Sequence, residues 1–319
     1  MTLDEIEEQV KIAKTIAIFT HENPDGDAIG SSLAVYMILK KMYGKNVDAI
    51  IPVVPDTYKF VPCADETIRK AEEGKIYDLA IALDCADIKR LDDPTGAFES
   101  AKVTVNVDHH SSNTMFADYN FVNPVAPACA QIVTSICASL GVDINREVGT
   151  ALLTGIITDT GGLRYDGVTA ETYEFVADIL KKGVKVSKVY NQAFAAISRE
   201  KFELKKLATN RIEFLENGKI AYTYITKEDM DACNVTISDL EGIVEIGRDI
   251  QGVEVSVFIY EKPDGFKASL RSNEYVNCAD VCLIFGGGGH IKAAGCTLPC
   301  SLEEAKERML TEIKRVIKN

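Results

Sequence analysis

The segment HENPDGDAIG, which runs from His21 to Gly30, places one imidazole and three carboxylates within ten residues. Side chains of these two kinds can hold a metal ion or transfer protons, and His21, Asp25 and Asp27 are the candidates. The same segment also has the composition of a turn in which an aspartate caps the following helix. Its chemistry therefore has to be judged together with the rest of the chain.

Acidic and imidazole groups recur in three later segments. Asp84 ends the apolar run YDLAIALD, and Asp108, His109 and His110 end the run KVTVNVDHH. Asp159 lies in GIITDTGG, at the end of an apolar helical pattern. The chain has only four histidines, and three of them lie in these segments or in the first one. Each group alone could be a cap or a turn residue, but their joint occurrence favours one shared site.

Four carboxylates that converge would repel one another and destabilise the fold unless cations balance them. Two divalent ions would balance Asp25, Asp27, Asp84 and Asp159, and two neutral imidazoles would complete the ligands. Carboxylate and imidazole ligands without thiolates favour Mn²⁺ over zinc, with Mg²⁺ or Co²⁺ as substitutes. Two such ions, about 3.5 to 4 Å apart, can activate a water and polarise a phosphoryl group. The residues therefore predict metal-assisted phosphoester hydrolysis.

Alternating strand and helix patterns over roughly the first 190 residues predict a mostly parallel sheet flanked by helices. Ligands bind such sheets beyond the carboxyl ends of the strands, which is where the acidic segments fall. Gly30 would allow close packing at the start of the first such helix. Strands are expected at residues 15–20, 46–54, 77–84 and 102–108, and helices at 28–44, 128–140 and 146–158.

A different pattern follows the charged segment 198–210, which we interpret as a linker helix. Residues 211–226 and 252–272 each read as two strands around a turn. The glycine run GGGGH, an apolar strand and an amphipathic helix at 302–317 complete the chain. We expect a catalytic, metal-binding domain at 1–197, a linker at 198–210 and a smaller α/β substrate-binding domain at 211–319, with a cleft between the domains.

The composition of the 319-residue chain narrows the class of protein. No basic leader or long apolar run is present, and the nine cysteines form no CxxC pair, so we expect a cytoplasmic protein with reduced thiols and no membrane contact. The net charge of −13 argues against a long duplex nucleic acid as partner. A small anionic substrate is compatible with this charge if cations are concentrated locally.

The ordered set HENPDGDAIGSS, ALDCAD, NVDHHSSN and TDTGG, followed by GGGGHIKAAGC, resembles the DHH phosphoesterase family with its DHHA1 C-terminal domain. The resemblance spans nearly the whole chain. Many relatives have Asp-His at the start of the first motif, whereas Thr20 precedes His21 here. Because the histidine is the ligand, this departure leaves the metal assignment unchanged.

The resemblance implies a role for each residue of these motifs. Asp84 would bridge the two metal ions, Asp108 would orient the histidines from behind, and His110 would face the phosphate as a hydrogen-bond donor or acid. One ion would be held by His21, Asp25 and Asp84, and the other by Asp27, Asp84, His109 and Asp159.

The glycine run is the candidate substrate-binding motif of the C-terminal part. Consecutive glycines can expose backbone N–H groups to an anion, and Arg271 and His290 could add positive charge. A glycine run alone is usually a structural turn, but the DHHA1 resemblance favours binding. Arg271 would then clamp a terminal phosphate. The candidate residues are Arg271, Ser272, Gly286, Gly287, Gly288, Gly289 and His290.

Within the family, the chain is similar to stand-alone oligoribonucleases that also dephosphorylate 3′-phosphoadenosine 5′-phosphate (pAp). Short single-stranded RNA or a small nucleotide is therefore the expected substrate, and a homodimer is the expected assembly. Three alternatives stay open. They are a phosphodiesterase for cyclic or linear dinucleotides, an inorganic pyrophosphatase, and a nucleotide-binding module without catalysis.

Overall fold

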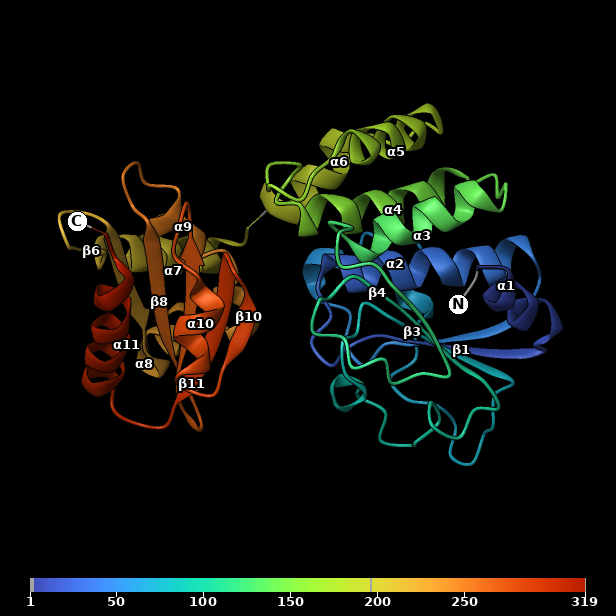
Figure 1. Ribbon diagram of the computed structural model, residues 1–319, viewed down its shortest axis with the longest axis horizontal. Coiled ribbons are helices and arrows are strands. Elements are labelled where there is room, and N and C mark those ends of the chain that lie inside the picture. Colours follow the sequence, from blue (N-terminus) through green and yellow to red (C-terminus); the bar gives the residue numbers. More distant parts are fainter. Residues whose placement is uncertain (1–2, 196, 319) are drawn as a thin grey trace. The chain divides into compact units, whose positions relative to one another are not determined.

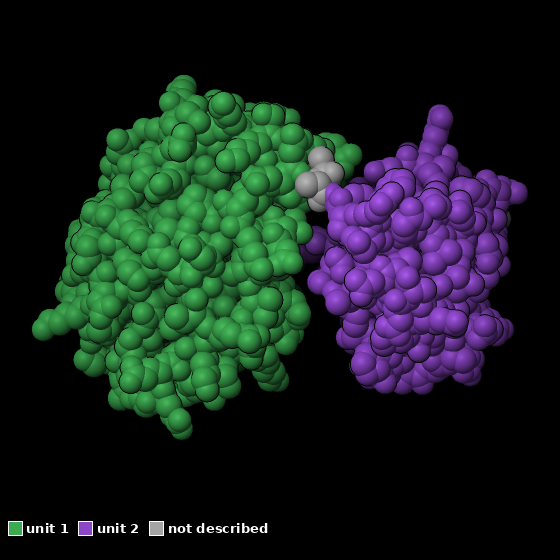
Figure 2. Space-filling view, turned by 180° about the vertical axis from the view of Figure 1, so that it is seen from behind, with its two compact units in different colours: residues 1–196 green, residues 197–319 purple. Residues whose placement is uncertain are grey.

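The computed structural model describes residues 3–195 and 197–318, and the chain divides into two compact units, Met1–Ala196 and Ile197–Asn319 (Figures 1 and 2). None of the helices within these described residues is long and apolar enough to cross a membrane.

The first unit is built on a five-stranded sheet in the order β2-β1-β3-β4-β5, and every pairing in it is parallel. The predicted mostly parallel sheet is therefore confirmed. All carboxyl ends lie at one edge, so residues that follow different strands can meet there. The sequence analysis missed β5, a short strand of half-buried residues. The strands are β1 (Thr15–Phe19), β2 (Asn46–Ile50), β3 (Leu79–Leu83), β4 (Thr104–Asp108) and β5 (Tyr119–Val122).

Helices α2, α3 and α4 lie together on one face of this sheet, and α5 and α6 lie outside α4 (Figure 1). The helix expected over residues 28–44 continues from α2 into the π-helix η1 before Gly44. On the opposite face, loops and short 3₁₀ turns enclose a second cluster around Phe19, Tyr77 and Phe98. The helical segments are α1 (Leu3–Ile12), α2 (Gly26–Tyr36), η1 (Met37–Met42), η2 (Asp56–Tyr58), η3 (Ala64–Glu66), η4 (Ile88–Arg90), α3 (Cys129–Ser139), α4 (Arg146–Asp159), α5 (Ala170–Lys181), α6 (Val186–Tyr190) and η5 (Asn191–Ala195).

The second unit contains a six-stranded mixed sheet in the order β10-β11-β9-β8-β7-β6, in which only the β7–β8 pairing is parallel. The two expected hairpins are present as β6–β7 and β8–β9. The strands are β6 (Glu213–Leu215), β7 (Ile220–Ile225), β8 (Val255–Lys262), β9 (Gly265–Ser272), β10 (Gly288–His290) and β11 (Ala293–Leu298).

Helices pack on both faces of this second sheet. Helices α10 (Cys278–Leu283) and α11 (Leu302–Val316) cover one face. The other face carries α7 (Arg199–Asn210), α8 (Lys227–Cys233), η6 (Ile237–Leu240) and α9 (Val244–Arg248). The helix that we interpreted as a linker is α7, and its Leu204 and Ala208 are buried in the core of the second unit.

Gly30 lies where α2 packs against α4, and a Cβ atom there would be 2.5 Å from the Ala151 carbonyl oxygen. We expect Gly30→Ala to lower the free energy of unfolding by about 1–3 kcal/mol through overpacking, despite the better helix propensity of alanine. Urea denaturation measures this change. The control is Gly167→Ala, where the new Cβ would be 3.5 Å from Pro127 and the expected change is below about 0.5 kcal/mol. An unchanged midpoint for Gly30→Ala would contradict the close approach of the helices.

Candidate functional site

The predicted metal ligands meet at the carboxyl edge of the first sheet. One ligand atom from each member of three groups lies within 4.8 Å of the others. Asp84 and His109 each belong to two of these groups, so these two residues connect the three groups. The groups are His21, Asp25 and Asp84; Asp27, His109 and Asp159; and Asp84, His109 and His110.

Asp25 lies at the start of α2, where it caps the helix. Its Oδ1 accepts hydrogen bonds from the backbone N–H groups of Asp27 (2.9 Å) and Ala28 (3.1 Å). The turn-and-cap interpretation of this segment is therefore correct for one oxygen of Asp25. The cap also fixes the side chain beside His21 and Asp84, so the structural role and a ligand role are compatible.

Asp27 is buried in the first turn of α2 and faces the N-terminus of α3. Its Oδ2 accepts the N–H of Cys129 at 2.5 Å, and its Oδ1 accepts the N–H of Ala130 at 2.8 Å. A helix N-terminus favours a negative charge, but burial still raises the pKa of Asp27 to about 6. Gly155 of α4 leaves the room that this carboxylate needs, since a Cβ there would be 2.6 Å from its Oδ1.

Asp84 follows β3 with a left-handed backbone conformation (φ 53°), which is costly for a residue with a side chain. Only 2% of the residue is exposed, and its Oδ1 has no hydrogen-bond partner among the described residues. Burial and the nearby Asp27 hold the pKa of Asp84 well above its ordinary value. Two imidazole nitrogens, His109 Nε2 and His110 Nδ1, lie 3.5 and 3.6 Å from this Oδ1 oxygen without forming a hydrogen bond, so a bound cation would satisfy it better.

His109 presents Nε2 to the carboxylates because its Nδ1 donates to the Ala126 carbonyl at 3.1 Å. Nε2 lies 3.4 Å from Asp159, 3.5 Å from Asp84 and 3.9 Å from Asp27. Burial lowers the pKa of His109, but these carboxylates outweigh it and raise the pKa to about 11. A divalent ion among the carboxylates would take the place of this proton.

His21 differs from His109 because burial dominates its environment. Burial lowers the pKa of His21 to about 4, so the ring is neutral at pH 7 and keeps a lone pair for a ligand. Its Nε2 lies 3.9 Å from Asp84, and its buried Nδ1 has no hydrogen-bond partner among the described residues. His21 therefore faces Asp84 through Nε2, which is the nitrogen that could bind a cation beside this carboxylate.

The donor set fits divalent cations with a preference for oxygen and imidazole ligands. Two buried thiols lie close by, but each donates to a backbone carbonyl, Cys129 to Val107 and Cys85 to Asp87. Burial raises the pKa of both thiols, so neither is a thiolate ligand.

Asp108 supports His110 from behind and is absent from the three ligand groups. Its Oδ1 accepts from His110 Nδ1 at 2.7 Å, and its Oδ2 accepts from the Asn113 amide at 2.6 Å. Burial raises the pKa of Asp108, but the bonds from His110 and Asn113 outweigh it, and the pKa lies below its ordinary value. The sequence analysis did not single out Asn113, although it ends the motif NVDHHSSN.

In the second unit, the strand register brings Arg271 and His290 to the same face of the sheet. Both residues pair with Ala293 of β11, one from β9 and one from β10. Arg271 Nε donates to Glu245 of α9 at 3.0 Å, which fixes the guanidinium. Ser272 is buried and donates its hydroxyl to the Val276 carbonyl at 2.7 Å, which is a structural contact.

Strand geometry accounts for most of the glycine run. A Cβ at Gly287 would be 2.3 Å from the Gly295 carbonyl oxygen, and one at Gly289 would be 2.5 Å from that of Ala293. Gly286 has a positive φ of 73°. Gly288 is exposed and has open space where a Cβ would be, so close packing does not require a glycine there.

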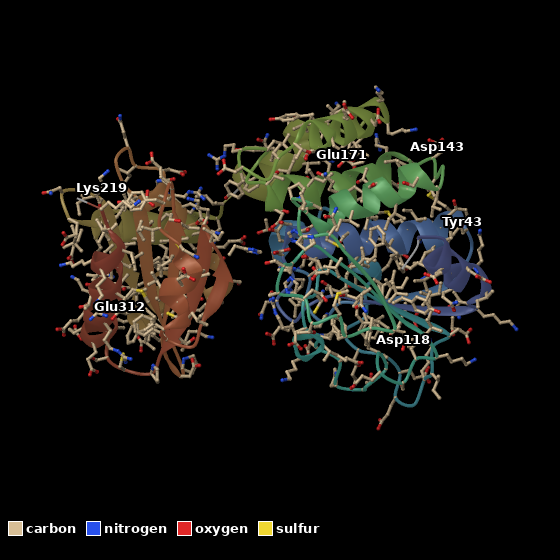
Figure 3. All side chains as sticks on the ribbon, viewed as in Figure 1. Tyr43, Asp118, Asp143, Glu171, Lys219 and Glu312 are labelled. Carbon is tan, nitrogen blue, oxygen red and sulfur yellow. The ribbon has the colours of Figure 1, made fainter. Side chains whose placement is uncertain are left out.

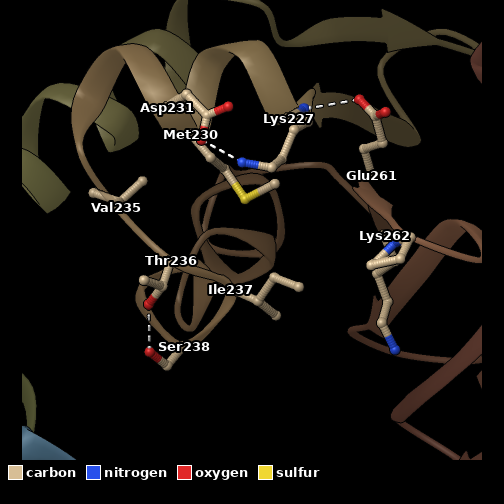
Figure 4. Close-up of a pocket in the computed structure, with 10 residues that line it drawn as sticks. Lys227, Met230, Asp231, Val235, Thr236, Ile237, Ser238, Glu261 and Lys262 are labelled. Carbon is tan, nitrogen blue, oxygen red and sulfur yellow. Dashed lines mark hydrogen bonds and ion pairs between the residues drawn. The ribbon is translucent and has the colours of Figure 1, made fainter.

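A pocket of about 760 Å³ lies elsewhere in the second unit, between α8, η6 and the end of β8 (Figure 4). Lys227 and Asp231 form an ion pair on its wall, and Met230 lines it. None of the predicted site residues lines this pocket, so it is separate from the two sites described above.

The pKa values predict how metal removal affects stability. In metal-free protein, we expect the free energy of unfolding to fall as the pH rises from about 6 to 8. Over this range folded His109 (pKa about 11) retains a proton that the unfolded chain has released, and the raised pKa values of Asp84 and Asp159 act in the same sense. The lowered pKa of His21 instead makes the free energy of unfolding rise with pH, but only between about pH 4 and pH 6.5.

The measurement is urea denaturation of chelator-treated protein across this pH range. Excess divalent cation should remove the trend, and Asp84→Asn should flatten it. A stability of the metal-free protein that increases with pH would contradict the arrangement of charges.

Comparisons with known proteins identify the families that both units match. Residues 15–156 match the N-terminal domain of the DHH family, and residues 217–319 match the DHHA1 domain. The bifunctional oligoribonuclease and PAP phosphatase NrnA of Thermus thermophilus is 34% identical, over 94% of this chain and 89% of that protein. The protein of the same name from Bacillus subtilis is 25% identical, over 97% and 96%.

Among solved structures, an exopolyphosphatase-related protein from Bacteroides fragilis matches with a TM-score of 0.90 and 26% identity, over 98% of this chain and 95% of that one. The fold, the clustered ligands and the identity to the Thermus protein lead to one conclusion: the chain belongs to the DHH family of phosphoesterases and carries a DHHA1 domain in its second unit.

Proposed function

We propose that this protein is a Mn²⁺-dependent phosphoesterase that hydrolyses short oligoribonucleotides to mononucleotides and pAp to AMP. The names of the Thermus and Bacillus relatives support the substrates. The observation that carries the chemistry is the buried carboxylate of Asp84, which has an unpartnered oxygen and belongs to two ligand groups. Such an oxygen is suited to bridging two cations.

His21, Asp25 and Asp84 would hold one ion, and Asp27, Asp84, His109 and Asp159 would hold the other. When bound, the two ions would polarise the phosphoryl oxygens and lower the pKa of the attacking water. The α3 N-terminus orients Asp27, and the Ala126 carbonyl orients His109, so these ligands are fixed before substrate arrives.

His110 is proposed to act on the phosphate itself. Asp108 accepts from its Nδ1 at 2.7 Å, which leaves Nε2 to donate a hydrogen bond or proton to the leaving oxygen. Asp108 holds this ring in place. Asn113 in turn holds Asp108 through its amide.

We propose that the second unit recognises the substrate through Arg271, His290 and the backbone around Gly288. Arg271 is anchored by Glu245, and its fork can bind a phosphate. The proposed domains are 1–197 for catalysis, 198–210 as linker and 211–319 for binding. The family resemblance further supports a cytoplasmic homodimer, whose mass can be measured by light scattering.

A substrate panel in Mn²⁺, with products separated by length, tests the activity. We expect release of AMP from pAp and of mononucleotides from a 5-mer RNA, with pApA and cyclic di-AMP cleaved more slowly. Exclusive cleavage of a cyclic dinucleotide would overturn the proposal in favour of a dinucleotide phosphodiesterase. Cleavage of pyrophosphate alone would identify an inorganic pyrophosphatase, and binding without product release would identify a module without catalysis.

The metal assignment has its own control in this panel. Asp84→Asn removes the bridging carboxylate with little change in volume, and kcat should fall by about 1000-fold or more. The metal content, measured by elemental analysis, should fall with it. Wild-type kcat in Asp84→Asn would show that the ligands are wrongly assigned.

Arg271→Lys tests substrate recognition by the second unit. Lysine keeps a charge opposite Glu245 but loses the planar fork, so KM should rise about 10-fold or more, in line with the ~1.5–3 kcal/mol of a charge-assisted hydrogen bond. The metal content and kcat should change little. Arg315→Lys, on the exposed side of α11, is the matched control. A loss of metal in Arg271→Lys would contradict a role in recognition alone.

A further inference from the structure

The loop that follows Asp159 folds two side chains back over Gly161. The backbone N–H groups of Arg164 and Tyr165 both donate to the Thr160 carbonyl, at 3.0 and 3.2 Å. Gly161, Gly162 and Leu163 have positive φ values of 58°, 77° and 66°, which reverse the chain within three residues. Arg164 and Tyr165 are therefore held against the turn that directly follows Asp159, the proposed ligand at the end of α4.

Tyr165 presents an exposed ring on the turn that follows Asp159. A Cβ at Gly161 would be 2.3 Å from the Cζ atom of Tyr165, so the ring packs directly on this glycine. The residue remains 40% exposed. A second exposed tyrosine, Tyr190, packs on Gly162 in the same way and lies 5.1 Å from the ring of Phe194. Exposed aromatic rings next to an acidic cluster are not explained by the core of the unit.

Arg164 supplies a cation at the same point. Its Nε donates to the Gly161 carbonyl at 2.8 Å, which fixes the guanidinium and leaves its terminal nitrogens available. The residue is exposed, and within the described parts of the chain no carboxylate forms an ion pair with it. The protein has a net charge of −13, and Arg164, two residues after Gly162, is a fixed cation without an acidic partner among the described residues. Such a cation is suited to an anionic ligand.

We propose that Arg164 and Tyr165 form a nucleotide subsite beside the metal centre, in which Tyr165 stacks on a nucleobase and Arg164 binds a phosphate. The subsite rests on the proposed function, because it positions a nucleotide for the phosphoesterase reaction. Aromatic side chains stack on any base, at about 1–3 kcal/mol per base, and a guanidinium fork matches a phosphate. The ring would stack on the base while the guanidinium binds the phosphate of the same nucleotide.

A ligand pair that differs only in the base tests this subsite. AMP and ribose 5-phosphate share the phosphate and the sugar, and their dissociation constants in Mn²⁺ can be measured by calorimetry. The wild-type protein should bind AMP about 5- to 150-fold more tightly, which is the stacking energy expressed as an affinity ratio. Tyr165→Leu should reduce this ratio towards one, while Tyr165→Phe should keep it.

Arg164→Ala should weaken both ligands by the same factor of about 10 and leave their ratio unchanged. Two control variants make the same kinds of substitution at other helix ends, one after η1 and one at the start of α4. Tyr43→Leu replaces an exposed tyrosine at the end of η1 (Figure 3), and Arg146→Ala acts at the first residue of α4, about 20 Å along the helix from Asp159. Both should leave the two affinities unchanged.

Structural damage and failure of the proposed function are distinguishable from failure of the subsite. Each variant is compared with wild type by urea denaturation and metal content, and Tyr165→Phe must restore the affinity ratio that Tyr165→Leu loses. An unchanged ratio in Tyr165→Leu, in protein that hydrolyses RNA, overturns the subsite alone. A wild-type protein that cleaves nothing in the panel but prefers AMP through Tyr165 overturns the proposed function and supports the subsite.

Discussion

The mutual repulsion of buried carboxylates is the constraint on which the first unit depends. Asp27 and Asp84 are almost completely buried, and Asp159 lies against them, so burial and proximity raise all three pKa values. Two backbone N–H groups at the start of α3 donate hydrogen bonds to Asp27, and they offset only part of the cost of burying these carboxylates. The unpartnered oxygen of Asp84 leaves the remainder to bound cations. The ions that are proposed to activate the substrate would also stabilise the folded chain, which would link stability to catalysis.

The packing of α2 against α4 brings the two halves of the metal centre together. Glycines make this approach close enough, since a Cβ at Gly26 would be 2.4 Å from Thr158 and one at Gly30 would be 2.5 Å from Ala151. Asp27 begins one helix and Asp159 ends the other, so the contact between the helices sets the distance between the carboxylates. A substitution that separates the helices would disturb the ligands without touching them.

The glycine run of the second unit has a structural role at some of its positions but not at all of them. Gly287 and Gly289 are required by the approach of β11, while Gly288 has no such requirement and is open to a ligand. Arg271 on β9 and His290 on β10 pair with Ala293 of β11 from opposite sides. The small alanine side chain leaves room between the two longer side chains on this face of the sheet. The structural explanation of such a run therefore applies to Gly287 and Gly289, and the proposed binding role falls on Gly288.

The local sequence was enough to predict the parallel sheet, the hairpins and the types of ligand, because apolar periodicity and strand-end aspartates are local signals. It missed β5, whose residues are only half buried, and it could not show that α7 packs within the second unit or that Ser272 is buried. The sequence also could not predict the left-handed backbone of Asp84, or the folding of Arg164 and Tyr165 over Gly161. The sequence by itself determined which side chains are candidates for holding metal and phosphate. Only the tertiary structure decided which oxygens remain unpartnered, because hydrogen bonding and burial depend on residues that are distant along the chain.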